Sequence, residues 1–277
     1  MVLVRKQSGE LEDFDPEKVR GAIVRAGATS ELADRIVSEV DMRIRDGVTT
    51  RDIYDMAFHL LDREKPSIAT RFGLKDAVMR LGPTGYPFEK YMGAVLSEYG
   101  YKVELNQMVE GKCVTHEIDL ILTDPEGKRH MVECKYHNNK GFKTGIKETL
   151  YTYARFLDLK EGGVLGKCGS FDGVWLVCNT KISGEGVTYG KCRGMKILAW
   201  GYPEGDSIQQ MIESKGLYPI TILRSVDGKV MDRLARANIM LLRELLSYDV
   251  HDLVVKTGLP ENRINRMLDE VKGIYSF

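Results

Sequence analysis

Three charged residues that could act on one phosphate group lie on either side of a short turn. Asp119 stands in one apolar run of the chain, while Glu133 and Lys135 stand in a second, with a Pro/Gly turn over 124–128 between the runs. Two such runs around a turn predict adjacent antiparallel strands. If the turn centres on Glu126, Asp119 and Glu133 are cross-strand neighbours with Cβ atoms roughly 5 Å apart, and Lys135 projects from the same face.

Two bare carboxylates at that separation repel each other, and a divalent cation would relieve the repulsion. Mg²⁺, or Mn²⁺ in its place, suits such a site because it is a hard ion held by one or two carboxylates together with water and substrate phosphate. Lys135 could then orient the attacking water and stabilise charge that develops on the phosphate. The alternative is a structural ion pair of Lys135. Because both acids stand among apolar neighbours, where an unpaired charge is expensive, the spacing favours a metal site.

These residues, with the helix that opens Phe88-Glu89-Lys90-Tyr91, resemble the PD-(D/E)XK nuclease superfamily, and specifically its Mrr-like restriction endonuclease branch. The resemblance spans about residues 83 to 203. It implies a metal-dependent phosphodiesterase that acts on DNA, with Asp119 and Glu133 as the metal ligands. The catalytic residues that it implies are Glu89, Asp119, Glu133 and Lys135. One departure is Glu148, because many relatives carry Gln downstream of the lysine.

The overall charge gives no global attraction to nucleic acid, since 40 basic residues balance 40 acidic ones. Any attraction must therefore be local. Between Lys128 and Lys147, six cations accompany Glu133 as the one acid, a net charge of +5. A basic loop beside a metal site is suited to contact with the phosphate backbone, although it is also compatible with an ordinary solvated loop. The predicted DNA contacts are Lys140, Lys143 and Lys147.

A separate unit is expected over residues 1–82, where a short hairpin precedes a series of apolar helical stripes. This order, with the segments 4–9, 14–19 and 47–53, resembles the ATP-cone, the nucleotide-sensing domain found in front of ribonucleotide reductases and their repressors. The resemblance implies contacts with ATP or dATP from Val4, Lys6, Glu12, Lys18 and Thr50. No Walker-type phosphate loop occurs, so the nucleotide would be an effector and not a fuel. The alternative is a degenerate cone that serves only in protein contacts.

The last part of the chain, residues 217–277, has the pattern of several short helices. Its turn Thr257-Gly258-Leu259-Pro260 resembles that of a helix-hairpin-helix module, which offers backbone N–H groups to DNA phosphate. Arg263 and Arg266 lie close by in the sequence and would add phosphate contacts. A role in dimerisation or packing is the alternative for this segment.

Cysteine and hydropathy patterns indicate the compartment. The five cysteines form no Cys-x-x-Cys pair and the histidines show no ligand spacing with them, which is typical of reduced intracellular thiols and not of zinc sites. No apolar stretch approaches the roughly 18 residues of a membrane span. We therefore expect a cytoplasmic protein with no membrane partner.

Taken together, these patterns predict an α/β core over 83–216, with a restriction-endonuclease-like mixed sheet flanked by helices. An N-terminal α+β ATP-cone over 1–82 and a small all-α domain over 217–277 complete the chain. The predicted function is Mg²⁺-dependent endonuclease cleavage of DNA, regulated by ATP or a related adenine nucleotide through the arrangement of a homodimer or higher homo-oligomer. The alternative is a nucleotide-sensing DNA-binding regulator with a catalytically inactive nuclease fold.

Overall fold

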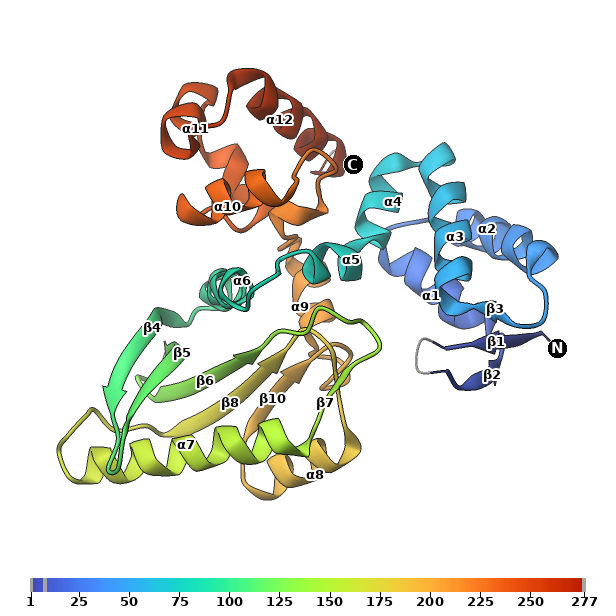
Figure 1. The fold of residues 1–277 in the computed structure, drawn as a ribbon. Coiled ribbons are helices and arrows are strands. Elements are labelled where there is room, and N and C mark those ends of the chain that lie inside the picture. Colours follow the sequence, from blue (N-terminus) through green and yellow to red (C-terminus); the bar gives the residue numbers. More distant parts are fainter. Residues whose placement is uncertain (1, 7–8, 276–277) are drawn as a thin grey trace. The chain divides into compact units, whose positions relative to one another are not determined.

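The chain forms two compact units (Figure 1) in a computed structural model that describes residues 2–6 and 9–275. One unit comprises Met1–Val78, Ile220–Arg233 and Leu242–Phe277, and the other comprises Met79–Pro219 and Leu234–Leu241. Within the described residues, no helix is both long and apolar enough to cross a membrane.

The N-terminal part of the first unit is a three-stranded sheet packed with helices. Strand β1 pairs with β2 in antiparallel register, with Val4 opposite Glu12, and with β3 in parallel. Asp15 caps the first helix, because its carboxylate accepts the amide hydrogen of Glu17 at 3.0 Å, and Pro16 occupies the first helical position. The elements are β1 (Leu3–Arg5), β2 (Leu11–Asp13), α1 (Pro16–Arg25), α2 (Ser30–Arg43), β3 (Val48–Thr49), α3 (Thr50–Glu64), α4 (Pro66–Phe72) and α5 (Leu74–Met79).

The second unit is built on a five-stranded mixed sheet of order β10-β8-β6-β5-β4. Strands β4, β5 and β6 are antiparallel neighbours, whereas β6, β8 and β10 run parallel. A small parallel pair, β7 with β9, lies outside this sheet. The strands are β4 (Lys102–Glu110), β5 (Thr115–Thr123), β6 (Arg129–Lys135), β7 (Lys143–Thr144), β8 (Gly173–Cys178), β9 (Lys181–Ile182) and β10 (Lys196–Ala199).

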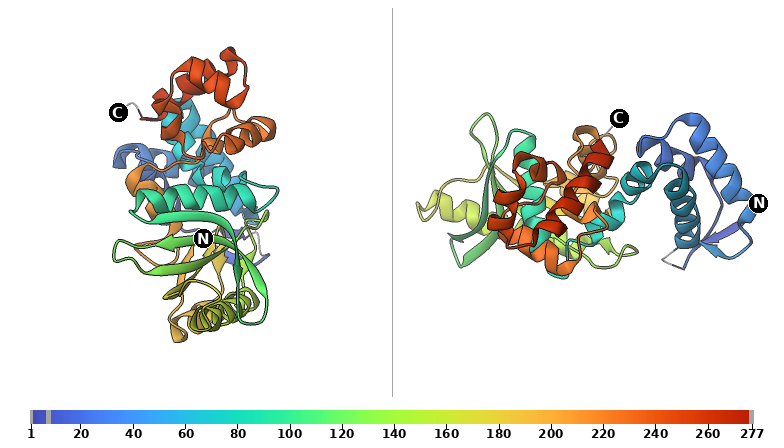
Figure 2. Two further views of the ribbon diagram at one scale, coloured as in Figure 1. Left: turned by 90° about the vertical axis from the view of Figure 1, so that its left-hand side faces the viewer. Right: turned by 90° about the horizontal axis from the view of Figure 1, so that it is seen from above.

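Helices cover both faces of this sheet, with α6 on one face and α7 and α8 on the other (Figure 2, left). Gly93 of α6 faces the strands, and a side-chain carbon there would meet Leu105 and Leu120 at ordinary van der Waals distances of 3.4 and 3.6 Å. On the other face, Phe156 and Leu159 of α7 join the core of the sheet. The helices are α6 (Tyr86–Glu98), α7 (Ile146–Val164), α8 (Gly184–Cys192) and α9 (Ile208–Lys215). The mixed α/β core predicted from the sequence is thus present.

The C-terminal segment is helical, as predicted. Its elements are a 3₁₀ turn η1 (Ile220–Ile222), α10 (Gly228–Arg236), η2 (Leu242–Ser247), α11 (Val250–Thr257) and α12 (Glu261–Tyr275). Gly258 ends α11 in the left-handed region at φ +65°, a conformation that favours glycine. Inside the first unit, the hydroxyl of Thr221 donates to the carbonyl oxygen of Ala77 at 2.6 Å, so that the segment is hydrogen bonded to the end of α5.

Candidate functional site

Asp119 and Glu133 lie on neighbouring strands at the point where β5 and β6 stop pairing. The paired residues run as far as Leu120 opposite Val132, and the same register places Asp119 opposite Glu133 at the next step. There the backbone bond is replaced by a side-chain bond, because the amide of Cys134 donates to the Asp119 carboxylate at 2.6 Å. The cross-strand neighbourhood expected from the turn is therefore the arrangement in the fold.

The carboxyl group of Asp119 titrates near neutrality. Burial, then the negative charge of Glu133, raise its pKa to about 7, and these effects outweigh the hydrogen bond from Cys134, which lowers it. Two acids that share a partly buried space cannot both ionise cheaply.

Glu133 is almost inaccessible to solvent, with 2% of its surface exposed, and two cations compensate its charge. The ammonium of Lys135 contacts one carboxylate oxygen, and the guanidinium of Arg155 on α7 contacts the other. Burial alone would lower the pKa of Lys135, but its hydrogen bond to Glu133 raises it overall. Lys135 is therefore charged throughout the neutral range.

Glu89 of α6 adds a third acid to this neighbourhood. Burial raises its pKa, and the charges of Glu117 and Glu133 act in the same direction. The carboxylate of Glu89 accepts a hydrogen bond from the side-chain amide nitrogen of Asn106 at 2.9 Å. Asn106 has a φ of +49° and lies in β4 between the residues that pair with β5 on either side of Asp119, so a local distortion of β4 faces the acids.

Sequence reasoning missed Arg155 and Asn106. Arg155 follows Thr152 by three residues and precedes Leu159 by four, and both of these are buried, so helical spacing places the arginine on the sheet-facing side of α7. That spacing could have identified it. No comparable signal marks Asn106, because its left-handed backbone conformation is a property of the folded sheet.

The basic segment predicted to contact DNA leads from β6 into α7. Lys143 and Lys147 are exposed and Lys140 is partly exposed. Glu148 closes the first turn of α7, since its carboxylate accepts the amide hydrogen of Gly145 at 2.9 Å. Within the described part of the chain, no group of three or more His, Cys, Asp or Glu residues is arranged to hold a metal ion.

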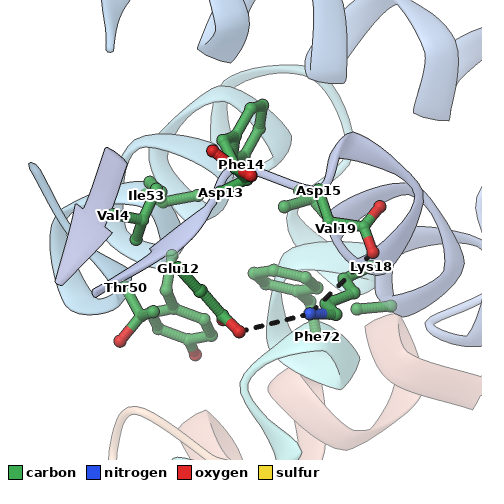
Figure 3. A pocket seen from close by; sticks show the side chains of 12 residues that line it. Val4, Glu12, Asp13, Phe14, Asp15, Lys18, Val19, Thr50, Ile53 and Phe72 are labelled. Atoms are coloured by element: carbon green, nitrogen blue, oxygen red, sulfur yellow. Dashed lines mark ion pairs between the residues drawn. The ribbon is translucent and has the colours of Figure 1, made fainter. Parts of the chain in front are cut away.

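A second candidate site is a pocket of about 200 Å³ in the N-terminal domain (Figure 3). Its wall is largely apolar, and Tyr54 stacks on Phe72 there with ring centroids 5.0 Å apart. Of the five predicted nucleotide contacts, four line the pocket and Lys6 does not. The lining residues are Val4, Glu12, Asp13, Phe14, Asp15, Lys18, Val19, Ala22, Thr50, Ile53, Tyr54 and Phe72.

Glu12 forms ion pairs with both lysines predicted to contact nucleotide, Lys18 in the pocket lining and Lys6 outside it. Its carboxylate lies 2.8 Å from the ammonium of Lys6 and 3.6 Å from that of Lys18, which is also 3.9 Å from Asp15. The hydrogen bond from Lys6 lowers the pKa of Glu12, and the same bond raises the pKa of Lys6. Lys6 thus joins the predicted group through Glu12, although it stands outside the lining.

Comparison with known proteins finds a curated relative, a solved structure and a matching family model. A curated protein of Archaeoglobus fulgidus, described as an uncharacterized protein, is 40% identical over 183 residues, which are 66% of this chain and 99% of the relative. The crystal structure of AF1548, a protein of unknown function, is 39% identical with a TM-score of 0.61 and covers 69% of this chain and 98% of its own. The family model "AF1548-like, C-terminal" matches residues 218–275. The chain belongs to the AF1548-like family. About a third of this AF1548-like protein lies outside the match to the curated relative.

The ATP-cone domain model matches residues 2–72 of the AF1548-like protein. The ATP-cone predicted from the sequence is therefore confirmed, and the pocket of Figure 3 lies within it. An ATP-cone indicates regulation by nucleotide binding.

The two arginines predicted to contact DNA lie in the C-terminal domain of the AF1548-like protein, but the structure gives them different surroundings. Arg263 is 3.3 Å from the carboxylate of Asp227 and 3.2 Å from the carbonyl oxygen of Ser225, so its guanidinium already has partners within the domain. Arg266 has 71% of its side chain exposed and lies 3.6 Å from Glu270. Of the two, Arg266 is the more available to an outside ligand.

Proposed function

We propose that this AF1548-like protein is a metal-dependent DNA endonuclease regulated by an adenine nucleotide. The observation that supports this most strongly is the convergence of Asp119, Glu133 and Lys135 where β5 and β6 part, on a mixed sheet flanked by helices. The resemblance of these residues to the PD-(D/E)XK pattern supports the same reaction. Exposed lysines follow β6 directly, at the entrance to α7.

The donor atoms of the site fit Mg²⁺ or Mn²⁺. Asp119 and Glu133 offer hard carboxylate oxygens. Burial is the main cause of the raised pKa of Asp119 and the charge of Glu133 the second, and a cation would offset the negative charge. A divalent ion bound there would lower the pKa of a bound water and polarise the phosphate. Glu89 would assist as a third acid at the same place.

Lys135 supplies what the chain itself contributes to the chemistry. Its ammonium remains charged near neutral pH, lies beside Glu133, and would stabilise charge that develops on the phosphate as the P–O bond breaks. Lys140, Lys143 and Lys147, with Arg266 of the C-terminal domain, would bind the DNA backbone and position it.

The ATP-cone would bind ATP or dATP in its pocket. Val4 and Thr50 line the pocket with Lys18, and Lys6 and Lys18 are the cations nearest to Glu12. A triphosphate would exchange these ion pairs for its own contacts with the lysines. Regulation would require that the nucleotide bind two subunit arrangements of a homo-oligomer with different affinity.

Nicking of supercoiled plasmid in Mg²⁺, with and without ATP, tests the proposal. Wild-type protein should nick the plasmid, and Lys135→Met should reduce the rate by about 10²-fold or more, because a charge aimed at the developing oxyanion is lost. Lys160→Met, which changes an exposed lysine of α7 packed over the ring of Phe156, should leave the rate unchanged.

Full activity of Lys135→Met would reject the catalytic assignment. If wild type nicks neither methylated nor unmethylated plasmid, while ATP still shifts its DNA affinity, the protein is instead a nucleotide-sensing regulator with an inactive nuclease fold.

A further inference from the structure

Glu133, a proposed metal ligand, has both of its carboxylate oxygens occupied by side chains. Lys135 contacts Oε1 and Arg155 contacts Oε2. The side chains of Glu133 and Arg155 are 3% and 11% exposed, whereas that of Lys135 is 30% exposed. The ring centroid of Tyr151 lies 5.6 Å from the ammonium nitrogen of Lys135 and 5.4 Å from the guanidinium carbon of Arg155.

Arg155 also bridges the two strands where their pairing ends. Its Nη2 donates to the carbonyl oxygen of Glu117 in β5, while its Nη1 contacts the carboxylate of Glu133 in β6. The remaining nitrogen, Nε, is buried and has no hydrogen-bond partner among the described residues. A buried donor left unsatisfied costs free energy, and this cost weakens the hold of Arg155 on its present position.

Among the described residues, the charged groups in this neighbourhood include four acids and two bases, which are Glu89, Glu117, Asp119, Glu133, Lys135 and Arg155. Arg155 is the base that enters from α7, and it takes an oxygen of Glu133 that a metal ion would need. It also places a positive charge close to any arriving cation. Both effects oppose metal binding, and both end if Arg155 leaves Glu133.

We propose that Arg155 is a positioning residue that holds Glu133 in place and competes with the divalent cation for it. Arg155 thereby sets the metal concentration at which the site fills. The inference rests on the proposed function, in which Asp119 and Glu133 are the metal ligands.

Titration calorimetry of the full chain with Mn²⁺ tests the competition without relying on activity. Arg155→Gln should lower the dissociation constant for Mn²⁺ by about tenfold or more, because a competing charge within contact distance of Glu133 is gone. Arg155→Lys restores the charge and should return the constant toward the wild-type value. Lys160→Gln removes a charge from the exposed side of α7 and should change the constant less than about twofold.

An unchanged or larger dissociation constant in Arg155→Gln would overturn the competition. A purely structural role for Arg155 predicts weaker Mn²⁺ binding in Arg155→Gln, since a disordered Glu133 is a poorer ligand. The direction in which the dissociation constant changes therefore separates competition from a structural role. If Arg155→Gln does not fold by circular dichroism, Arg155→Met takes its place, because it also removes the competing charge and should tighten Mn²⁺ binding to a similar extent.

Asp119→Asn locates the bound ion. If Asp119→Asn abolishes Mn²⁺ binding and Arg155→Gln does not tighten it, the role of Arg155 is rejected and the metal site stands. If Asp119→Asn leaves Mn²⁺ binding unchanged, the ion binds elsewhere, and the proposed function fails together with this inference.

Discussion

At the scale of single residues, Asp119 sets how the charge of the acidic site varies with pH. Its pKa is about 7 in the folded protein, against about 3.9 for an aspartate in an unfolded chain. The folded state therefore binds this proton more tightly than the unfolded state does. Ionisation of Asp119 costs stability as the pH rises from about 4 to about 7, and the whole cost is present above that range.

Replacing Asp119 by Asn should consequently stabilise the metal-free protein at alkaline pH. In EDTA, we expect Asp119→Asn to be more stable than wild type by roughly 2 to 4 kcal/mol at pH 8, and to gain nothing at pH 4. Urea unfolding at the two pH values measures the difference. A variant less stable than wild type at pH 8 would show that the ionised carboxylate is favourably solvated in the fold.

Asp158 provides a control, because its pKa is shifted in the direction opposite to that of Asp119. Burial would raise its pKa, but hydrogen bonds from His116 and from the amides of Cys113 and Val114 lower it overall. Its stabilising contribution is therefore present above the unfolded pKa of about 4 and is lost as the pH falls below it. Asp158→Asn should be less stable than wild type at pH 8, and the gap should narrow as the solution is acidified.

At the scale of elements, a close contact fixes α7, the helix that carries Arg155, against the turn between β4 and β5. A side-chain carbon added to Gly162 would come within 2.8 Å of the backbone of Gly111. Such backbone contacts leave no room for relaxation. Glycine at position 162 therefore fits this contact, although its helix propensity is low.

Two Gly→Ala changes separate propensity from packing. Gly162→Ala should destabilise the protein by about 1 to 3 kcal/mol through overpacking. Gly273→Ala in α12, where an added carbon meets nothing within 4 Å, should stabilise it by up to about 1 kcal/mol. Thermal or urea unfolding of both variants provides the comparison. Equal effects of the two changes would mean that α7 can move away from the turn.

The hairpin of β5 and β6 was predictable because a strong local signal sets its register. The turn over 124–128, with Gly127 at φ +82°, fixes the count that pairs Asp119 with Glu133. Arg155 approaches Glu133 from 22 residues away in the chain. Helical spacing indicates the sheet-facing side of α7, but the strand residue that Arg155 meets there is set by packing. The first unit likewise gathers three separate segments of the chain, a grouping that arises from long-range contacts and that chain order does not reveal.

At the scale of the whole molecule, the proposed regulation links an ATP-cone to a nuclease in one chain. A nucleotide can shift an equilibrium between subunit arrangements only by its difference in affinity for them. The cone pocket holds Lys18 and Glu12 in reach of each other, so the binding of a triphosphate would alter contacts that exist without it.

Sedimentation velocity with and without ATP is expected to show a change in the oligomer distribution. Lys18→Met, which removes a pocket cation, should raise the ATP concentration needed for that change by about tenfold, a loss of roughly 1.4 kcal/mol of binding. Arg35→Met, which removes an exposed arginine of α2 paired with Glu64, serves as the control. A sedimentation profile that ATP leaves unaltered would argue against regulation through assembly.

Glu12 also bears on selectivity between two phosphate-bearing ligands. DNA gains affinity mainly by releasing small counterions as it meets unpaired cations on a protein. Lys6 and Lys18 already have a carboxylate counter-ion within the domain, so a passing duplex gains little there. A triphosphate that enters the pocket can exchange that carboxylate for several oxygens of its own. The cone would in this way stay reserved for nucleotide while DNA binds, as proposed, to other lysines of the chain.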